Sequence, residues 1–226
     1  MRSSGLPVRA VRAAAGAVLL AGVLALAGCG TGAQSYPPTG VDELVVPTPV
    51  PHADDFVARI DNAWLPLSPG RTWTYDVRRT GHPDAVRSVR VLPDPVIVEG
   101  VSTTAVRTEI RRPGEQRVGW TDYYAQDTRG DVWWFGRAGS WQAGREGAEA
   151  GLVVTATPRL GDGYRAGYEK GVVEDVVTVA QAQPVLSLEW SSELAPGAER
   201  WETYRKGVGM VDSVDTSTGE HAVLRR

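Results

Sequence analysis

The sequence predicts a mainly β fold, either a curved antiparallel meander sheet or a barrel, with tight turns and little helix. Apolar and polar residues alternate with a period of two in several segments of the 226-residue chain, which is typical of strands with one buried face. Turn pairs that contain glycine separate these segments at short range. Helical stripes are nearly absent beyond residue 52, whereas parallel strands would need long helical crossovers.

Residues 1–28 have the three parts of a secretory signal peptide. Three arginines and no acidic residue form a basic start, and an apolar centre over 17–26 leads into small residues. This centre is shorter than the roughly 20 residues of a membrane-spanning helix. We therefore expect this segment to direct export and to be removed.

Leu26-Ala27-Gly28-Cys29, at the end of this segment, resembles the lipobox of bacterial lipoproteins, and Cys29 is the only cysteine. The resemblance implies that Cys29 carries a diacylglycerol of the palmitate type and begins the mature protein. Two acyl chains hold a protein on a bilayer durably, whereas one gives marginal binding. The expected location is extracytoplasmic, with the membrane as partner through the anchor on Cys29.

A proline-rich linker is predicted for residues 29–51, followed by a single β domain over 52–226. The linker has five prolines and no periodicity, and such chain is stiff and extended. Removal of residues 1–28 takes away three arginines and no acid, which leaves 21 basic and 27 acidic residues and a net charge of −6. A chain with this charge is not expected to bind nucleic acid.

The expected elements of the domain begin with one or two helical turns in 53–62, where two apolar residues lie four apart behind two aspartates. Alternating strand patterns follow at 71–79, 103–112 and 186–194, with Leu194 as the last apolar residue of the third. Strands with one apolar and one charged face predict an antiparallel sheet that has one face exposed to solvent. In all, about nine or ten strands are expected.

Five dipeptides with glycine in second place predict the turns between these strands. In Pro69-Gly70 the proline presets the first φ of a type II turn, and the glycine accepts the positive second φ. The other four are Glu99-Gly100, Arg129-Gly130, Pro196-Gly197 and Thr218-Gly219. The Arg129-Gly130 pair closes a hairpin over 121–136. Four glycines in the next segment, 137–151, predict an irregular and functional loop that carries Trp141.

Four blocks of sequence resemble a family of uncharacterised secreted or lipid-anchored bacterial proteins. They are IDNAWLPLSPGRTWTY (60–75), DYYAQDTRGDVWWFG (122–136), GSWQAG (139–144) and KGVGMV (206–211). The resemblance implies a mostly β fold and no established activity. An acid commonly follows the second block in the family, where this chain has Arg137. More loosely, a curved meander on a lipid anchor is similar to carriers of the LolA and LppX type.

Catalytic, metal and cofactor sites find little support in the sequence. Its three histidines are scattered, and no HExxH, paired-cysteine or Gly-x-Ser-x-Gly pattern occurs. We therefore expect no catalytic residue, metal ligand or cofactor. Asp122, Asp127 and Asp131 remain open as acid–base or calcium groups, although aspartates beside a tight turn are favoured for bonds to the backbone.

Aromatic residues on both faces of the predicted hairpin leave two interpretations open. In the first, they form a thick core, and Trp141 closes it from the glycine-rich loop. In the second, Trp120, Tyr124, Trp134 and Trp141 line a groove for an amphiphile or a glycan. The chain is accordingly interpreted as an extracytoplasmic binding or envelope-associated module, and the alternative is a carboxylate-based envelope hydrolase.

Overall fold

The computed structural model describes residues 51–226, which contain one short 3-10 helix and fifteen β-strands. The helix, Ala53–Asp55, replaces the longer helical segment expected in 53–62. The strands are β1 (Phe56–Val57), β2 (Thr72–Arg79), β3 (Ala85–Val91), β4 (Val96–Val98), β5 (Val101–Arg111), β6 (Val118–Asp127), β7 (Val132–Arg137), β8 (Trp141–Gln142), β9 (Glu149–Val154), β10 (Gly163–Glu169), β11 (Val173–Gln181), β12 (Leu186–Ser192), β13 (Arg200–Arg205), β14 (Gly209–Asp215) and β15 (Glu220–Leu224). Within the described part, no helix is long and apolar enough to span a membrane.

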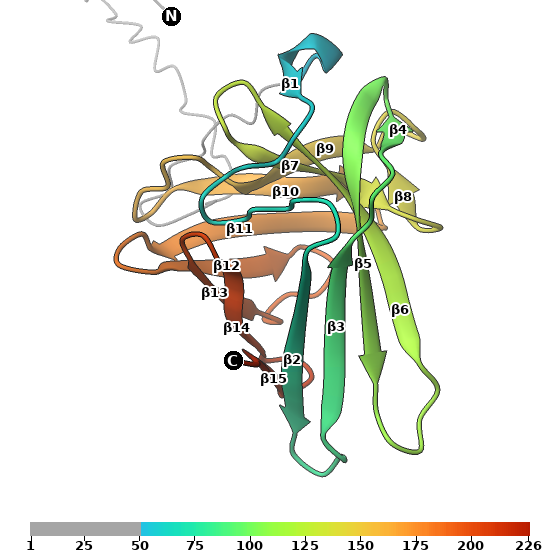
Figure 1. Cartoon of the computed structure of the whole chain (residues 1–226), viewed down its shortest axis with the longest axis vertical. Helices are drawn as coiled ribbons and strands as arrows, with labels where there is room; N and C mark the ends of the chain where they lie inside the picture. The colour runs from blue at the N-terminus through green and yellow to red at the C-terminus, as the bar shows by residue number, and fades with distance from the viewer. Residues whose placement is uncertain (1–50) are drawn as a thin grey trace, which may run out of the picture. The chain divides into compact units, whose positions relative to one another are not determined.

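Twelve of the strands close into an antiparallel barrel (Figure 1). The hydrogen-bonded path runs β6-β5-β3-β2-β15-β14-β13-β12-β11-β10-β9-β7, and pairing of β6 with β7 completes the ring. The short strands β1, β4 and β8 attach to it at β6, β5 and β7. In Figure 1, β2, β3, β5 and β6 run down the view while β10, β11 and β12 run across it. The predicted fold class is confirmed, in its closed form.

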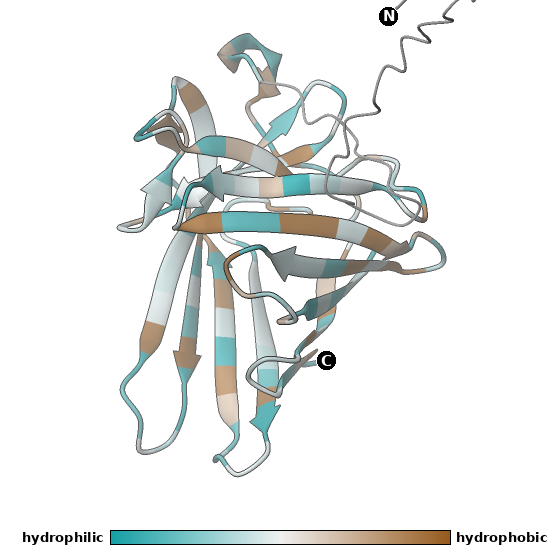
Figure 2. Ribbon diagram, turned by 180° about the vertical axis from the view of Figure 1, so that it is seen from behind, coloured by the Kyte–Doolittle hydropathy of each residue, from teal (hydrophilic) through white to brown (hydrophobic). Residues whose placement is uncertain are grey.

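The alternation predicted for the strands is confirmed, and Figure 2 shows it as alternating colours along several ribbons. In β2, Trp73, Tyr75 and Val77 are buried, and in β12 the apolar residues from Leu186 to Trp190 are. The placement of Leu194 in this strand was wrong. It is 46% exposed, because β12 ends at Ser192 and a turn begins.

The turn at Pro69-Gly70 has the predicted geometry. Gly70 has a φ of 82°, and the amide of Arg71 donates to the carbonyl of Ser68 at 3.1 Å. The expectation of an irregular loop over 137–151 was wrong, because β8 lies inside it and β9 begins inside it. Its glycines 139, 144 and 147 have positive φ, so they form tight turns between short strands rather than one long loop.

Residues 58–71, called the strap, cross one end of the barrel between β1 and β2. The amide oxygen of Gln126 on β6 accepts hydrogen bonds from the backbone of Asp61 and Asn62 at 2.9 and 2.8 Å. Farther along, the carbonyl of Ala63 accepts one at 2.7 Å from Gly207, in the turn between β13 and β14. These two anchor points lie on opposite sides of the ring, so the strap spans the opening.

Candidate ligand-binding cavity

The barrel encloses a cavity of about 380 Å³, which lies within the usual size range of small-molecule sites. Leu65 and Leu67 of the strap line one end of it. Eleven of the twelve ring strands contribute side chains to the wall, which include Trp73, Tyr75, Arg87, Thr108, Trp120, Asp122, Tyr124, Trp134, Arg137, Asp175, Trp190, Arg200, Glu202, Tyr204, Met210, Asp215 and Glu220.

The end beneath the strap is apolar and aromatic. Trp73 lies beside the turn between β13 and β14, and its indole N–H donates to the carbonyl of Val208 at 2.7 Å. The hydroxyl of Tyr75 donates to the carbonyl of Met210 at 3.1 Å. The polar atoms of both rings are therefore satisfied by the wall, so their apolar surface is what they offer to a ligand.

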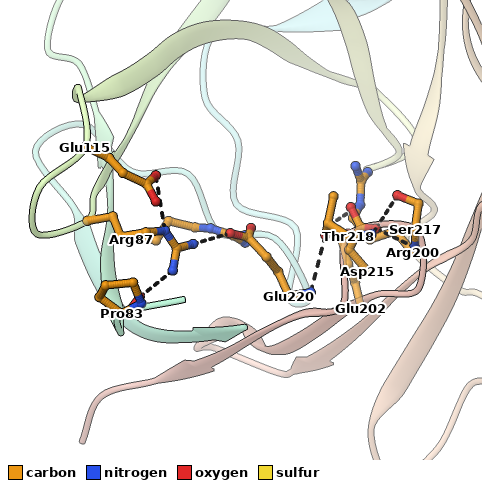
Figure 3. A network of polar contacts seen from close by, with 10 residues as sticks. Pro83, Arg87, Glu115, Arg200, Glu202, Asp215, Ser217, Thr218 and Glu220 are labelled. Carbon is orange, nitrogen blue, oxygen red and sulfur yellow. Dashed lines mark hydrogen bonds and ion pairs between the residues drawn. The ribbon is translucent and has the colours of Figure 1, made fainter. Parts of the chain in front are cut away.

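The other end of the cavity is charged, as the strand register shows. Arg200 of β13 pairs with Asp215 of β14, which in turn pairs with Glu220 of β15. Glu220 lies opposite Arg79, seven residues along β2 from the strap-side Thr72. Figure 3 shows Arg87, Arg200, Glu202, Asp215 and Glu220 gathered in this network. The cavity thus has an apolar end beneath the strap and a charged end away from it, and Arg87, which lies opposite Tyr75 in the sheet, is at the boundary between them.

Glu202 is held by three side chains of the cavity wall. It accepts hydrogen bonds from the indole N–H of Trp190 at 2.9 Å and from the hydroxyl of Tyr204 at 2.6 Å. The Nε of Arg200 lies 3.0 Å from it, and the guanidinium of Arg200 also lies over the ring of Trp190. Burial and the charge of Glu202 raise the pKa of Tyr204 well above its ordinary value, so this phenol stays protonated as a donor.

A second ion pair joins neighbouring strands of the wall. The Nε of Arg137 on β7 donates to the carboxylate of Asp122 on β6 at 2.8 Å. The guanidinium lies 5.1 Å from the ring centre of Trp120 and 5.4 Å from that of Trp134. Burial raises the pKa of Asp122, although Arg137 opposes this effect. Arg137 is therefore the partner of this buried carboxylate.

Three of the four predicted ligand-binding residues, Trp120, Tyr124 and Trp134, line this cavity together. Trp141 does not line it. It is 4% exposed and packs edge-on against Trp134, with ring centres 4.8 Å apart. A Cβ on Gly167 would lie 2.9 Å from its ring, so the ring fills the space over that glycine.

The opposite face of the β6–β7 hairpin is covered by the chain that precedes the barrel. Phe56 packs edge-on against Trp133 and Phe135, with ring centres 6.2 and 5.1 Å apart. This packing accounts for the aromatic residues on both faces of the hairpin.

Asp127 holds the hairpin turn together. Its carboxylate accepts hydrogen bonds from the amides of Arg129 and Asp131 at 2.9 and 3.0 Å, and from the indole N–H of Trp133 at 3.1 Å. The carboxylate of Asp131 accepts one from the amide of Ala156 at 2.8 Å. These bonds are what the turn interpretation predicts. In residues 51–226 no group of three or more acidic, histidine or cysteine side chains is arranged to hold a metal ion.

Apart from Asp122 and Arg137, the charged residues of the cavity were missed in the sequence, although a signal was present. In AVRSVRV (85–91), Arg87 shares its parity with Val89 and Val91, which predicts an inward arginine. Arg200, Glu202 and Tyr204 likewise share one parity on β13. A charged residue on the apolar parity of a strand is the pattern to search for.

Comparisons with known proteins identify neither a family nor a ligand for this cavity. No family model matches the chain, and no curated protein matches it. Among solved structures, a Bacteroides fragilis protein that is inferred to be exported and has a YmcC-like fold is similar over 73% of this chain and 98% of its own. The identity is 12% and the TM-score 0.41, so this likeness carries no argument about function.

Proposed function

We propose that this protein is an extracytoplasmic, lipid-anchored binding module whose barrel holds an amphiphile. The observation that carries the proposal is the cavity of about 380 Å³ with one apolar and one charged end. An amphiphile matches both ends, because its chain needs dry apolar contacts and its head needs charged partners. The proposal does not include catalysis. The two carboxylates that could act as acid and base, Asp122 and Glu202, are each paired with an arginine.

Export and lipid anchoring rest on the sequence alone, because residues 1–50 lie outside the described part. The signal segment, the resemblance to a lipobox and the lone cysteine support them. Cys29→Ser is expected to leave the precursor without a lipid and to shift the protein from the membrane fraction to the soluble or unprocessed pool. Fractionation with metabolic labelling by a fatty acid measures this. Acylation and membrane binding equal to those of the wild type would contradict the anchor.

Binding is tested by extracting the natively purified protein and identifying bound molecules by mass spectrometry. We expect an amphiphile in near-stoichiometric amount. Thr108→Phe places a ring on a buried position of the cavity wall, so it should remove most of the bound amphiphile. Glu109→Gln, next on the same strand and of the opposite parity, is the control and should retain it. Wild-type protein that carries no amphiphile when isolated from its own membranes would contradict the proposal.

A further inference from the structure

Arg87 has weaker partners than the other arginines at the charged end. Its side chain is 16% exposed, and its Nε is buried without a hydrogen-bond partner. The nearest carboxylate oxygen, on Glu220, lies 3.9 Å away, which is beyond hydrogen-bond distance. Glu220 is already engaged, because it accepts a hydrogen bond from Arg112 at 2.5 Å.

The other carboxylates at this end do not complete the bonding of Arg87. Asp215 accepts hydrogen bonds from Ser217 and Thr218 in its own turn. Glu202 is held by Trp190, Tyr204 and Arg200 as described above. Arg200 also has a buried Nε without a well-aligned hydrogen bond, although Glu202 is near it. Two guanidinium groups, one from β3 and one from β13, thus keep donor capacity at the same end of the cavity.

A buried cation with unmet donors is costly unless an acceptor arrives. Burial lowers the pKa of Arg87, and Glu202 and Glu220 offset this effect only in part. Guanidinium groups bind carboxylate and phosphate oxygens through paired, charge-assisted hydrogen bonds. A ligand group that matches both arginines therefore has the chemistry of an oxyanion.

We propose that the amphiphile has one hydrocarbon chain and an anionic head, a carboxylate or a phosphate, which accepts hydrogen bonds from Arg87 and Arg200. This inference rests on the proposed function. The chain then lies toward Leu65, Leu67 and Trp73 beneath the strap. A cavity of about 380 Å³ is near the small end of the range for ligand sites, which suits a single chain.

The test uses the full chain in lipid nanodiscs and four probes, with binding to empty nanodiscs subtracted. Dodecanoate, dodecyltrimethylammonium and dodecyl maltoside share a chain and differ in the head, and acetate has the head without a chain. We expect dodecanoate to bind most tightly and acetate not to bind. Arg87→Met should weaken dodecanoate binding about tenfold or more and leave dodecyl maltoside binding nearly unchanged. Arg87→Lys should give an intermediate loss.

Arg90→Gln is the matched control, because Arg90 lies on the same strand with an exposed side chain of the opposite parity. It should bind dodecanoate like the wild type. Equal binding of dodecanoate by Arg87→Met and the wild type would overturn this inference, as would tighter binding of the ammonium probe. In either case the proposed function would stand, because an amphiphile still binds. If none of the three chain-bearing probes binds, both this inference and the proposed function are overturned. If acetate alone binds, the ligand is a free anion and not an amphiphile.

Discussion

Trp141→Ala is expected to lower the free energy of unfolding by about 3 to 5 kcal/mol. Trp141 is 4% exposed, and its ring packs between Trp134 and the backbone of Gly167. Truncation removes this apolar contact and leaves a hole that the surrounding strands cannot collapse to fill. Chemical denaturation of the purified protein measures the loss, and the denaturant slope should stay the same.

Trp201→Ala is the matched control for this experiment. Trp201 is 37% exposed on β13, so its truncation should cost less than about 1 kcal/mol. The comparison decides between the two interpretations of the aromatic residues at this position. A loss as small for Trp141→Ala as for Trp201→Ala would show that Trp141 is dispensable to the core and would return it to a ligand-contacting role.

Asp127→Ala is expected to lower the free energy of unfolding by about 3 kcal/mol. The carboxylate is almost fully buried and accepts hydrogen bonds from two turn amides and from the indole of Trp133. Its removal leaves these donors unpaired beneath the turn, and an unpaired buried donor costs more than a lost exposed bond. Thermal and chemical denaturation measure the effect.

Asp54→Ala provides the control, because Asp54 is exposed in the short helix and should change stability by less than about 0.5 kcal/mol. Calcium should raise the stability of neither the wild type nor Asp127→Ala. Stabilisation of the wild type by calcium that the substitution abolishes would instead identify Asp127 as a metal ligand.

Local patterns predicted the longer strands and their turns, because each depends on a few neighbouring residues, but they predicted nine or ten strands where the structure has fifteen. Alternation around Trp73 and Tyr75 defines β2, and Pro69-Gly70 forms its turn without help from distant chain. Ring closure depends instead on the pairing of β15 with β2, which lie near opposite ends of the domain in sequence. At Gly151 of β9 a Cβ would lie 2.4 Å from the backbone of Ala166, so only glycine permits the close approach of β10 there. No local pattern marks that requirement.

The candidate site was predicted in part for a related reason. Trp120, Tyr124 and Trp134 stood out because large aromatics are conspicuous on a strand. Arg87 and Glu202 did not, because charged residues were assigned to the solvent side of each strand. In a closed barrel with an internal cavity, the inward parity can hold charge when partners from other strands meet it. Those partners are far apart in sequence, as with Arg112 and Glu220.

The closed ring also affects how copies of this protein behave when they are crowded together. A free strand edge offers unpaired N–H and C=O groups on which another chain can add as a further strand. Here every long strand has two neighbours, and the strands off the ring, β1, β4 and β8, are two or three residues long. The barrel therefore resists edge-to-edge aggregation, which would be an advantage if the proposed lipid anchor concentrates the protein on a membrane surface.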